Sequence, residues 1–165
     1  MSLEPAITDI ELLKDRPAIA KVLGWRKEAL QGAKWDRNEL TLWIDRHSLR
    51  EACKVLRDDE STGFNFLADL TCVDWYPSEP RFEVVYSLLS HKYKQRIRIK
   101  VKLSGDDTVV DSLTELWPGA DMFEREVFDL FGIRFQGHPY LRRLMMPDDW
   151  KGHPLRKDYP VEGYR

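Results

Sequence analysis

The stretch around Glu124, Arg125 and Glu126 holds the first residues whose types and spacing could do chemistry. An apolar stripe at helical spacing is formed by Phe123, Val127, Leu130 and Phe131. Glu124 falls inside this stripe, where a carboxylate needs a partner or its pKa rises. It could be a catalytic acid, but no second carboxylate, histidine or nucleophile has a convincing spacing beside it. The sequence therefore favours a buried ion pair with an arginine. On the opposite side, Arg125 and Asp129 are spaced i, i+4 and can pair.

A second group of candidates is a run of six basic residues at alternate positions. These are Lys92, Lys94, Arg96, Arg98, Lys100 and Lys102. Period two places all six on one face of a strand. The favoured interpretation is a solvated strand face whose repulsion is relieved by acids on the neighbouring strand. An acidic protein partner is the next possibility. Nucleic acid is disfavoured, because no RNP-type aromatic pattern or GxxG loop accompanies the run.

The third group consists of metal-compatible residues near the C-terminus, namely His138, His153, Asp148, Asp149 and Asp158. Their spacing fits no HExxH, HxH or Cys/His pattern, so we predict no metal site. The phosphate-binding motifs GxGxxG and GxxxxGK[ST] and the nucleophile motif GxSxG are also absent. Two cysteines, Cys53 and Cys72, cannot by themselves hold a conventional iron–sulfur cluster. We predict that both are reduced core residues.

The composition is that of a globular domain. The chain has 165 residues, 42% of them hydrophobic and 33% charged, with a formal net charge of -2. This balance argues against bulk attraction to nucleic acid or anionic lipid. The opening MSLEPAITDI lacks the basic and apolar regions of a secretory signal. No apolar run approaches the roughly 18 residues that span a bilayer, so any membrane association is expected to go through a partner.

The hydrophobic periodicities of the sequence predict an α+β fold, and the helices and strands of that fold must position these residues. Alternation of apolar and polar residues predicts four strands, at 39–45, 64–73, 82–89 and 95–103. Capping and stop signals predict two short helices before Gly24, a helix from Ser48 to about Asp59, a short helix capped by Ser112, and a stronger one from about Ala120 to Phe131. The expected architecture is a mixed or antiparallel sheet of about four strands, with helices on one face.

Residues 133–165 differ in composition from the rest of the chain. Four prolines and three glycines break any long element there, yet the segment is rich in Trp, Tyr, Leu and Met. Such a segment cannot build its own core, and its composition is not that of a disordered tail. We therefore predict an α+β domain at 1–132 and an extended arm at 133–165. The arm is expected to lie on its own domain or on a partner.

The end of the chain also resembles a known family. The string EREVFDLFGI begins at Glu124 and is followed by FQGHP, LRRL and DWKGHPLRKDYP, which ends at Pro160. This pattern closely resembles the signature of the 30 kDa (C) subunit of respiratory complex I. The upstream FNFLADLT, starting at Phe64, is similar to the core strand of that family. One departure is Met122, where family members often carry Trp.

The resemblance implies a scaffold without an active site of its own. Members of the family are α+β domains whose C-terminal arm lies on the quinone-site (49 kDa or D-type) subunit, near the iron–sulfur subunits of the peripheral arm. The resemblance implies no flavin, cluster or nucleotide in this chain, no nucleic-acid partner, and a peripheral position on the cytoplasmic side of the bacterial inner membrane. An alternative is the equivalent subunit of a membrane-bound hydrogenase, or of a quinone reductase that uses another donor. The signature residues expected at the interface are Glu124, Arg125, Glu126, Asp129, Gly132, Gly137, His138, Pro139, Arg142, Arg143, Trp150, Gly152, Pro154, Leu155, Arg156, Lys157 and Asp158.

Overall fold

The computed structural model describes residues 5–163, so the first four residues of the opening stretch and the last two residues of the arm lie outside it. The elements are α1 (Ile10–Leu13), α2 (Pro17–Trp25), η1 (Lys27–Ala29), β1 (Leu30–Asp36), β2 (Glu39–Ile44), η2 (Arg46–Ser48), α3 (Leu49–Asp58), β3 (Phe66–Asp74), β4 (Phe82–Ser90), β5 (Gln95–Leu103), β6 (Val109–Asp111), α4 (Ala120–Phe131) and β7 (Arg134–Gln136). The predicted α+β class is confirmed.

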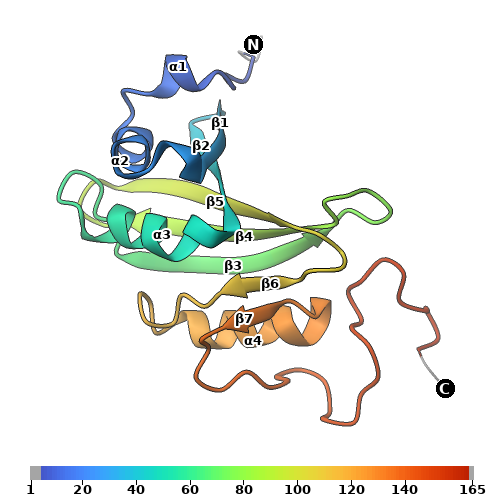
Figure 1. The fold of residues 1–165 in the computed structure, drawn as a ribbon. Helices are drawn as coiled ribbons and strands as arrows, with labels where there is room; N and C mark the ends of the chain where they lie inside the picture. Colours follow the sequence, from blue (N-terminus) through green and yellow to red (C-terminus); the bar gives the residue numbers. More distant parts are fainter. Residues whose placement is uncertain (1–4, 164–165) are drawn as a thin grey trace.

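The main sheet has five strands in the order β1-β2-β5-β4-β3 (Figure 1). It is mixed, because β2 runs parallel to β5 while the other neighbours are antiparallel. The strand that the sequence did not predict is β1, whose apolar alternation is interrupted by Gly32 and Lys34. Its hairpin with β2 turns at Arg37 and Asn38, both with positive φ. This pair lacks the glycine that usually signals such a turn.

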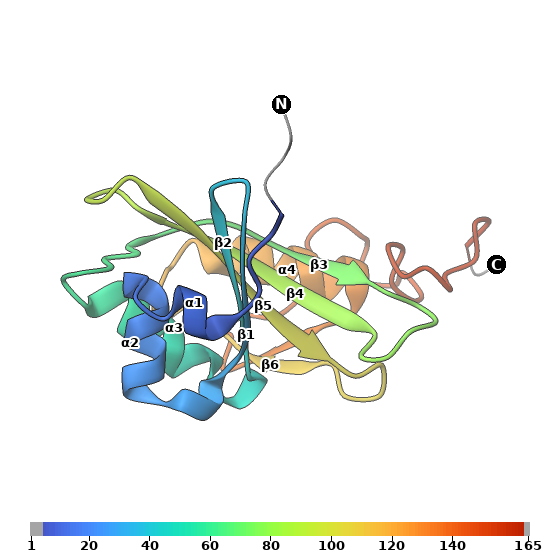
Figure 2. The same ribbon diagram turned by 90° about the horizontal axis from the view of Figure 1, so that it is seen from above.

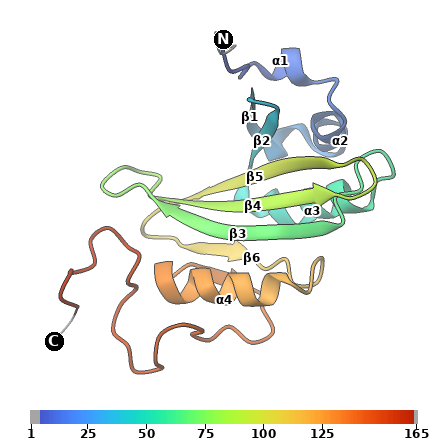
Figure 3. The ribbon, with the colours of Figure 1, turned by 180° about the vertical axis from the view of Figure 1, so that it is seen from behind.

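One face of the sheet forms the core. The inward side chains of the central strands alternate along the chain, as period two requires, and are fully or almost fully buried: Phe82, Val84, Tyr86 and Leu88 on β4, and Ile97, Ile99, Val101 and Leu103 on β5. Helix α3 lies across this face in Figure 1 and behind the strands in Figure 3. Figure 3 therefore views the opposite face of the sheet, which carries the basic side chains of β5.

Helix α4 and a small second sheet form the layer that carries the arm. α4 packs against the edge strand β3, and the parallel pair β6-β7 lies beside it (Figures 1 and 2). The short helix predicted after Ser112 is wrong. The amide of Ser112 instead donates to the carbonyl of Gln136 at 2.8 Å, which extends the β6-β7 ladder. The arm thus begins with a short strand paired to the domain.

Both cysteines are free and buried, as predicted. Burial raises the pKa of each thiol to about 12, so neither is a thiolate at neutral pH. Within residues 5–163, no helix is long and apolar enough to cross a membrane.

Candidate functional site

The carboxylate of Asp129, on α4, lies at the centre of the contacts between α4 and the arm. It is fully buried, with 0% of its surface exposed. Its Oδ1 accepts a hydrogen bond from Nη1 of Arg143 at 2.6 Å. Its Oδ2 accepts from three successive arm amides, those of Leu144, Met145 and Met146, at 3.0, 2.7 and 2.8 Å. Burial opposes ionisation, but the amides and the guanidinium outweigh it and hold the pKa of Asp129 below its usual value.

The guanidinium of Arg143 joins two parts of the arm to the helix. While Nη1 binds Asp129, Nη2 donates to the carbonyls of Trp150 and Gly152, each at 3.0 Å. One side chain thus fixes the 143–146 turn and the 150–152 turn against α4. A planar guanidinium suits this role because its donors point in fixed directions.

The arm also caps the C-terminus of α4. The last carbonyls of a helix have no partner within the helix and need one elsewhere. Here the carbonyl of Asp129 accepts from Nδ1 of His153 at 2.9 Å, that of Leu130 from the amide of Leu155 at 3.0 Å, and that of Phe131 from Nε of Arg156 at 2.6 Å. The positive charge of Arg156 at this end also complements the helix dipole. Burial lowers the pKa of His153, which favours the neutral ring.

Gly132 makes this close approach possible. It ends α4 in the left-handed conformation, with φ +77°. A Cβ at this position would lie 2.5 Å from Nη2 of Arg156 and 2.6 Å from the ring of His153. The absence of a side chain therefore serves both the backbone turn and the seating of the arm.

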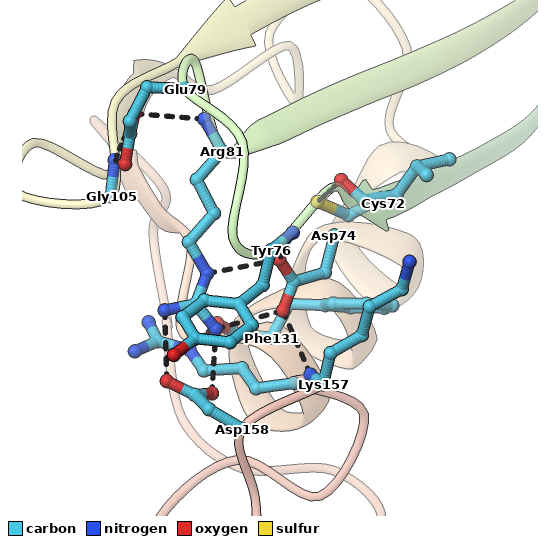
Figure 4. A network of polar contacts seen from close by, with 11 residues as sticks. Cys72, Asp74, Tyr76, Glu79, Arg81, Gly105, Phe131, Lys157 and Asp158 are labelled. Carbon is cyan, nitrogen blue, oxygen red and sulfur yellow. Dashed lines mark hydrogen bonds and ion pairs between the residues drawn. The ribbon is translucent and has the colours of Figure 1, made fainter.

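A second clamp holds the far end of the arm. Arg81, in the 75–81 loop between β3 and β4, binds Asp74 through Nε and Nη2, each at 2.9 Å, and Asp158 through Nη1 and Nη2 at 3.0 and 2.6 Å (Figure 4). The amide of Lys157 also donates to Asp74, at 2.9 Å. Burial opposes ionisation of Asp74, but Arg81 and the backbone amides of Lys157 and Tyr76 lower its pKa to about 2.

The predicted pairing of Arg125 with Asp129 is wrong. Arg125 instead donates to the carbonyls of Arg142 and Arg143, both at 3.3 Å, because the arm crosses its side of α4. Arg142 directs its guanidinium outward over the ring of Tyr140, 4.3 Å from the ring centroid. The 138–143 turn is therefore seated by backbone contacts, which leaves Tyr140 and Arg142 exposed.

His138 tethers the start of the same turn to the other end of α4. Its Nε2 lies 3.2 Å from both the carbonyl and Oδ1 of Asp121. Its Nδ1 accepts from the amide of Tyr140 at 3.0 Å. No group of three or more His, Cys, Asp or Glu residues in the part of the chain that the structure describes is arranged to hold a metal ion.

Several large apolar side chains of the arm and of α4 are exposed to solvent. They are Met122 on α4, and Tyr140, Met145, Trp150 and Leu155 on the arm, with Met145 60% exposed. Among the remaining signature residues, Glu126 and Pro139 are exposed, Pro154 is partly buried, and Gly137 and Gly152 adopt positive φ. The structure thus divides the predicted residues into an inward set that holds the arm and an outward set that presents a surface.

Glu124 is buried as predicted, but its partner is not an arginine. The predicted ion pair is wrong: Oε1 accepts from the amide of Leu113 at 2.7 Å, and Oε2 has no hydrogen-bond partner in residues 5–163. Burial raises the pKa of Glu124 to about 7 even though the Leu113 amide opposes the shift. The carboxyl joins α4 to the 112–117 turn. Sequence reasoning could not see this partner, because any residue supplies a backbone amide.

Asp74 and Arg81 are the contacts that sequence reasoning missed. A signal existed, since Asp74 continues the alternation of Leu70 and Cys72 on the buried side of β3. A carboxylate at such a position needs hydrogen-bond donors or a cation, or its pKa rises. In contrast, the prediction for the basic strand is confirmed for two of its residues: Arg98 pairs with Glu39 at 2.9 Å, and Lys100 with Glu83 at 2.7 Å. Lys92 and Lys94 precede β5 and lie in the turn of the hairpin.

Comparison with known proteins finds one family along most of the chain. Residues 42–165 match the model of the respiratory-chain NADH dehydrogenase 30 kDa subunit. The C subunit of the NADH-quinone oxidoreductase of Roseiflexus castenholzii is 47% identical over 148 residues, which cover 89% of this chain and 85% of the relative. The protein of the same name from Citrifermentans bemidjiense is 50% identical over 127 residues, which cover 77% of this chain and 78% of the relative.

Solved structures also resemble this chain, among them the two described next. The trypsin-resistant fragment (1–134) of Nqo5 is 35% identical and superimposes with a TM-score of 0.55, covering 62% of this chain and 83% of the fragment. A chain of an archaeal respiratory membrane complex, the membrane-bound sulfane sulfur reductase, shares the fold with a TM-score of 0.74 at 24% identity, covering 90% of this chain and 86% of that one. On the family match and the sequence relatives, the chain belongs to the family of the 30 kDa subunit of respiratory-chain NADH dehydrogenase.

Proposed function

We propose that this chain is a scaffold subunit of a proton-translocating NADH:quinone oxidoreductase and that its arm docks on the quinone-site (49 kDa or D-type) subunit. The observation that carries the proposal is the two-sided arm. Arg143, His153 and Arg156 of the arm bind the domain, whereas Tyr140, Met145, Trp150 and Leu155 of the same segment are exposed. Exposed aromatic residues and methionine, with arginine beside them, are the composition of interface cores.

The proposal assigns no chemistry to this chain. The buried acids described above act as structural hydrogen-bond acceptors, for arm amides at Asp129 and for the Leu113 amide at Glu124. We propose that flavin and iron–sulfur clusters belong to partner subunits, and that the iron–sulfur subunits are neighbours in the peripheral arm. Association with the membrane is then indirect, on the cytoplasmic side of the bacterial inner membrane.

Co-expression with the quinone-site subunit of the same organism tests the docking. A one-to-one complex on size exclusion is expected for the unchanged chain. Met145→Glu places a charge on the outward side while keeping the Met145 amide that binds Asp129, and it should abolish the complex. Asp148→Asn is the control for a change of one charge elsewhere on the arm, because Asp148 is also exposed. A complex that survives Met145→Glu, or a chain that ignores the quinone-site subunit, would refute docking through this surface.

The alternative assembly is a membrane-bound hydrogenase or a quinone reductase that uses another donor. The identity of the electron donor distinguishes it from an NADH:quinone oxidoreductase. Complex purified through a tag on this chain should oxidise NADH with a quinone as acceptor. Reduction of the quinone by another donor, with none by NADH, would favour the alternative and leave the docking role unchanged.

A further inference from the structure

A hollow of about 330 Å³ lies on the sheet face opposite α3, and its principal lining residues are Trp43, Trp75, Glu83, Lys100 and Lys102. The strand register fixes its place. Val73 pairs with Glu83, and Glu83 with Lys102, so their side chains share one face, and Trp75 continues the alternation of Val73 just beyond β3. Asp74, which holds the arm, points to the other face. The hollow and the Asp74 contact with the arm therefore lie on opposite faces of the sheet.

The hollow carries an unbalanced positive charge. Glu83 is 5% exposed, and both of its oxygens are occupied, Oε1 by Nε1 of Trp43 at 2.9 Å and Oε2 by Nζ of Lys100 at 2.7 Å. Lys102 is exposed and has no acidic partner among residues 5–163. Two lysines and one glutamate leave a net charge of +1 on the lining. An incoming carboxylate would find Lys102 available without having to break the Glu83 contacts.

The apolar wall of the hollow is held in place before any partner arrives. Trp75 is 50% exposed, and its backbone amide donates to the carbonyl of Arg81 at 2.8 Å. Glu79 accepts from the amides of Arg81, at 2.9 Å, and Gly105, at 3.2 Å, which closes the 75–81 loop against the end of β5 (Figure 4). The clamp of Arg81 on Asp74 fixes the same loop from the arm side. Because these contacts fix the backbone of the loop, binding at Trp75 costs little backbone conformational entropy.

We propose that this hollow docks an acidic segment of a second protein subunit, with an apolar side chain against Trp75 and a carboxylate beside Lys102. The proposal rests on the proposed function in that the partner is a subunit of the same assembly, but it uses a surface separate from the arm. A protein segment fits better than a nucleic acid, which needs several free cations in a row to follow its phosphates. Here Arg98 and Lys100 are already paired with acids.

Photo-cross-linking in the assembled complex tests the proposal. Benzoylphenylalanine replaces Trp75 in one preparation and Met145, on the arm, in another. The Trp75 probe should attach to an acidic segment of one protein subunit, identified by mass spectrometry. The docking site would be overturned if the Met145 probe cross-links but the Trp75 probe reacts only with lipid or nucleic acid, or with nothing. That result would leave the proposed function of the arm intact. A chain that does not co-purify with the complex would overturn both.

Charge reversal supplies a second, independent measurement. The cross-linked segment, made as a synthetic peptide, should bind Lys102→Glu about tenfold more weakly than the unchanged full chain. Lys54→Glu, an equal charge change at an exposed position on α3, should leave the affinity unchanged. A peptide with its carboxylate changed to lysine should bind Lys102→Glu as the original pair bound. Equal affinity for both variants, or no restoration in the swapped pair, would overturn the assignment of Lys102.

Discussion

Replacing Asp129 by asparagine should release the arm without unfolding the sheet. The asparagine side chain would keep one oxygen for the amides of Leu144, Met145 and Met146, but its amide nitrogen would then face the guanidinium of Arg143. Breaking one partner of a buried ion pair costs about 3–5 kcal/mol. For Asp129→Asn we expect a loss of about 3 kcal/mol, at the lower end of this range, because the neutral side chain retains one acceptor. That loss appears first in opening of the arm, since opening lets Arg143 return to water.

Hydrogen exchange at the amide of Leu155 measures this opening. This amide donates to the carbonyl of Leu130 and has no bond to the Asp129 side chain, so its protection reports the seating of the arm alone. A loss of about 3 kcal/mol corresponds to about 100-fold faster exchange when exchange follows the opening equilibrium. Amides within β4 should keep their protection, because they are protected by the core of the domain.

Asp148→Asn is the matched control for this experiment as well, as an identical change at an exposed arm position. It should leave the exchange of the Leu155 amide within about twofold of the unchanged chain, which is less than about 0.5 kcal/mol. Equal exchange in the two variants would show that the Asp129 contacts do not hold the arm. Equal loss of protection in β4 and in the arm would show that arm and domain open together, which would refute the separation assumed here.

Three further predictions follow from the other buried groups. Gly132→Ala should lower the free energy of unfolding by about 2 kcal/mol, because φ is +77° and the new Cβ meets the arm; chemical denaturation measures it, and an unchanged midpoint would contradict the close approach. Glu124 binds a proton more tightly in the folded state, so the free energy of unfolding should fall by up to about 3 kcal/mol as pH rises from about 4.5 to 7. Denaturation of Glu124→Gln at several pH values should show a flatter profile. A pH dependence that persists in the variant would mean that another group causes it. Asp74→Asn should lower the free energy of unfolding by about 3 kcal/mol. Asp158→Asn, whose aspartate side chain is 42% exposed, should lower it by less than about 1 kcal/mol. Thermal melts of both variants should show the larger loss for Asp74→Asn, and the reverse order would contradict the clamp.

The sequence was sufficient for the helix that carries the site and for four of the five strands of the main sheet. The apolar stripe of α4 and the glycine after Phe131 placed that helix, because both signals are local. The environment of Asp129 was predicted wrongly because its contacts are not local. On a helical wheel it lies away from the stripe and reads as solvent-facing, but the arm covers it, and the covering residues lie at least 14 positions further along the chain. No local pattern reports such a contact.

The failures at Glu124 and Asp74 have different causes. At Glu124 the sequence correctly indicated a buried carboxyl, but its partner is a backbone amide that carries no residue identity. At Asp74 the side-chain partner, Arg81, is visible as a residue type, but the 75–81 loop brings it into place. Asp158, which binds the same arginine, is brought there by the arm and lies 84 positions after Asp74. Charged residues on an apolar face can thus be recognised from the sequence, whereas the identity of their partners depends on how distant segments cross.

The contacts at the end of α4 decide how the arm can act in assembly. Three helix carbonyls, those of Asp129, Leu130 and Phe131, obtain their donors from the arm, so lifting the arm would leave the end of α4 to water. The arm is therefore held in place by contacts within its own chain. A partner that met a disordered arm would have to supply the ordering entropy of some thirty residues, at roughly 1 kcal/mol or more each. A seated arm avoids that cost, and the exposed side chains of Tyr140, Met145 and Trp150 can act as a fixed surface. Variants that unseat the arm, such as Asp129→Asn, should accordingly weaken docking although they change no residue on that surface.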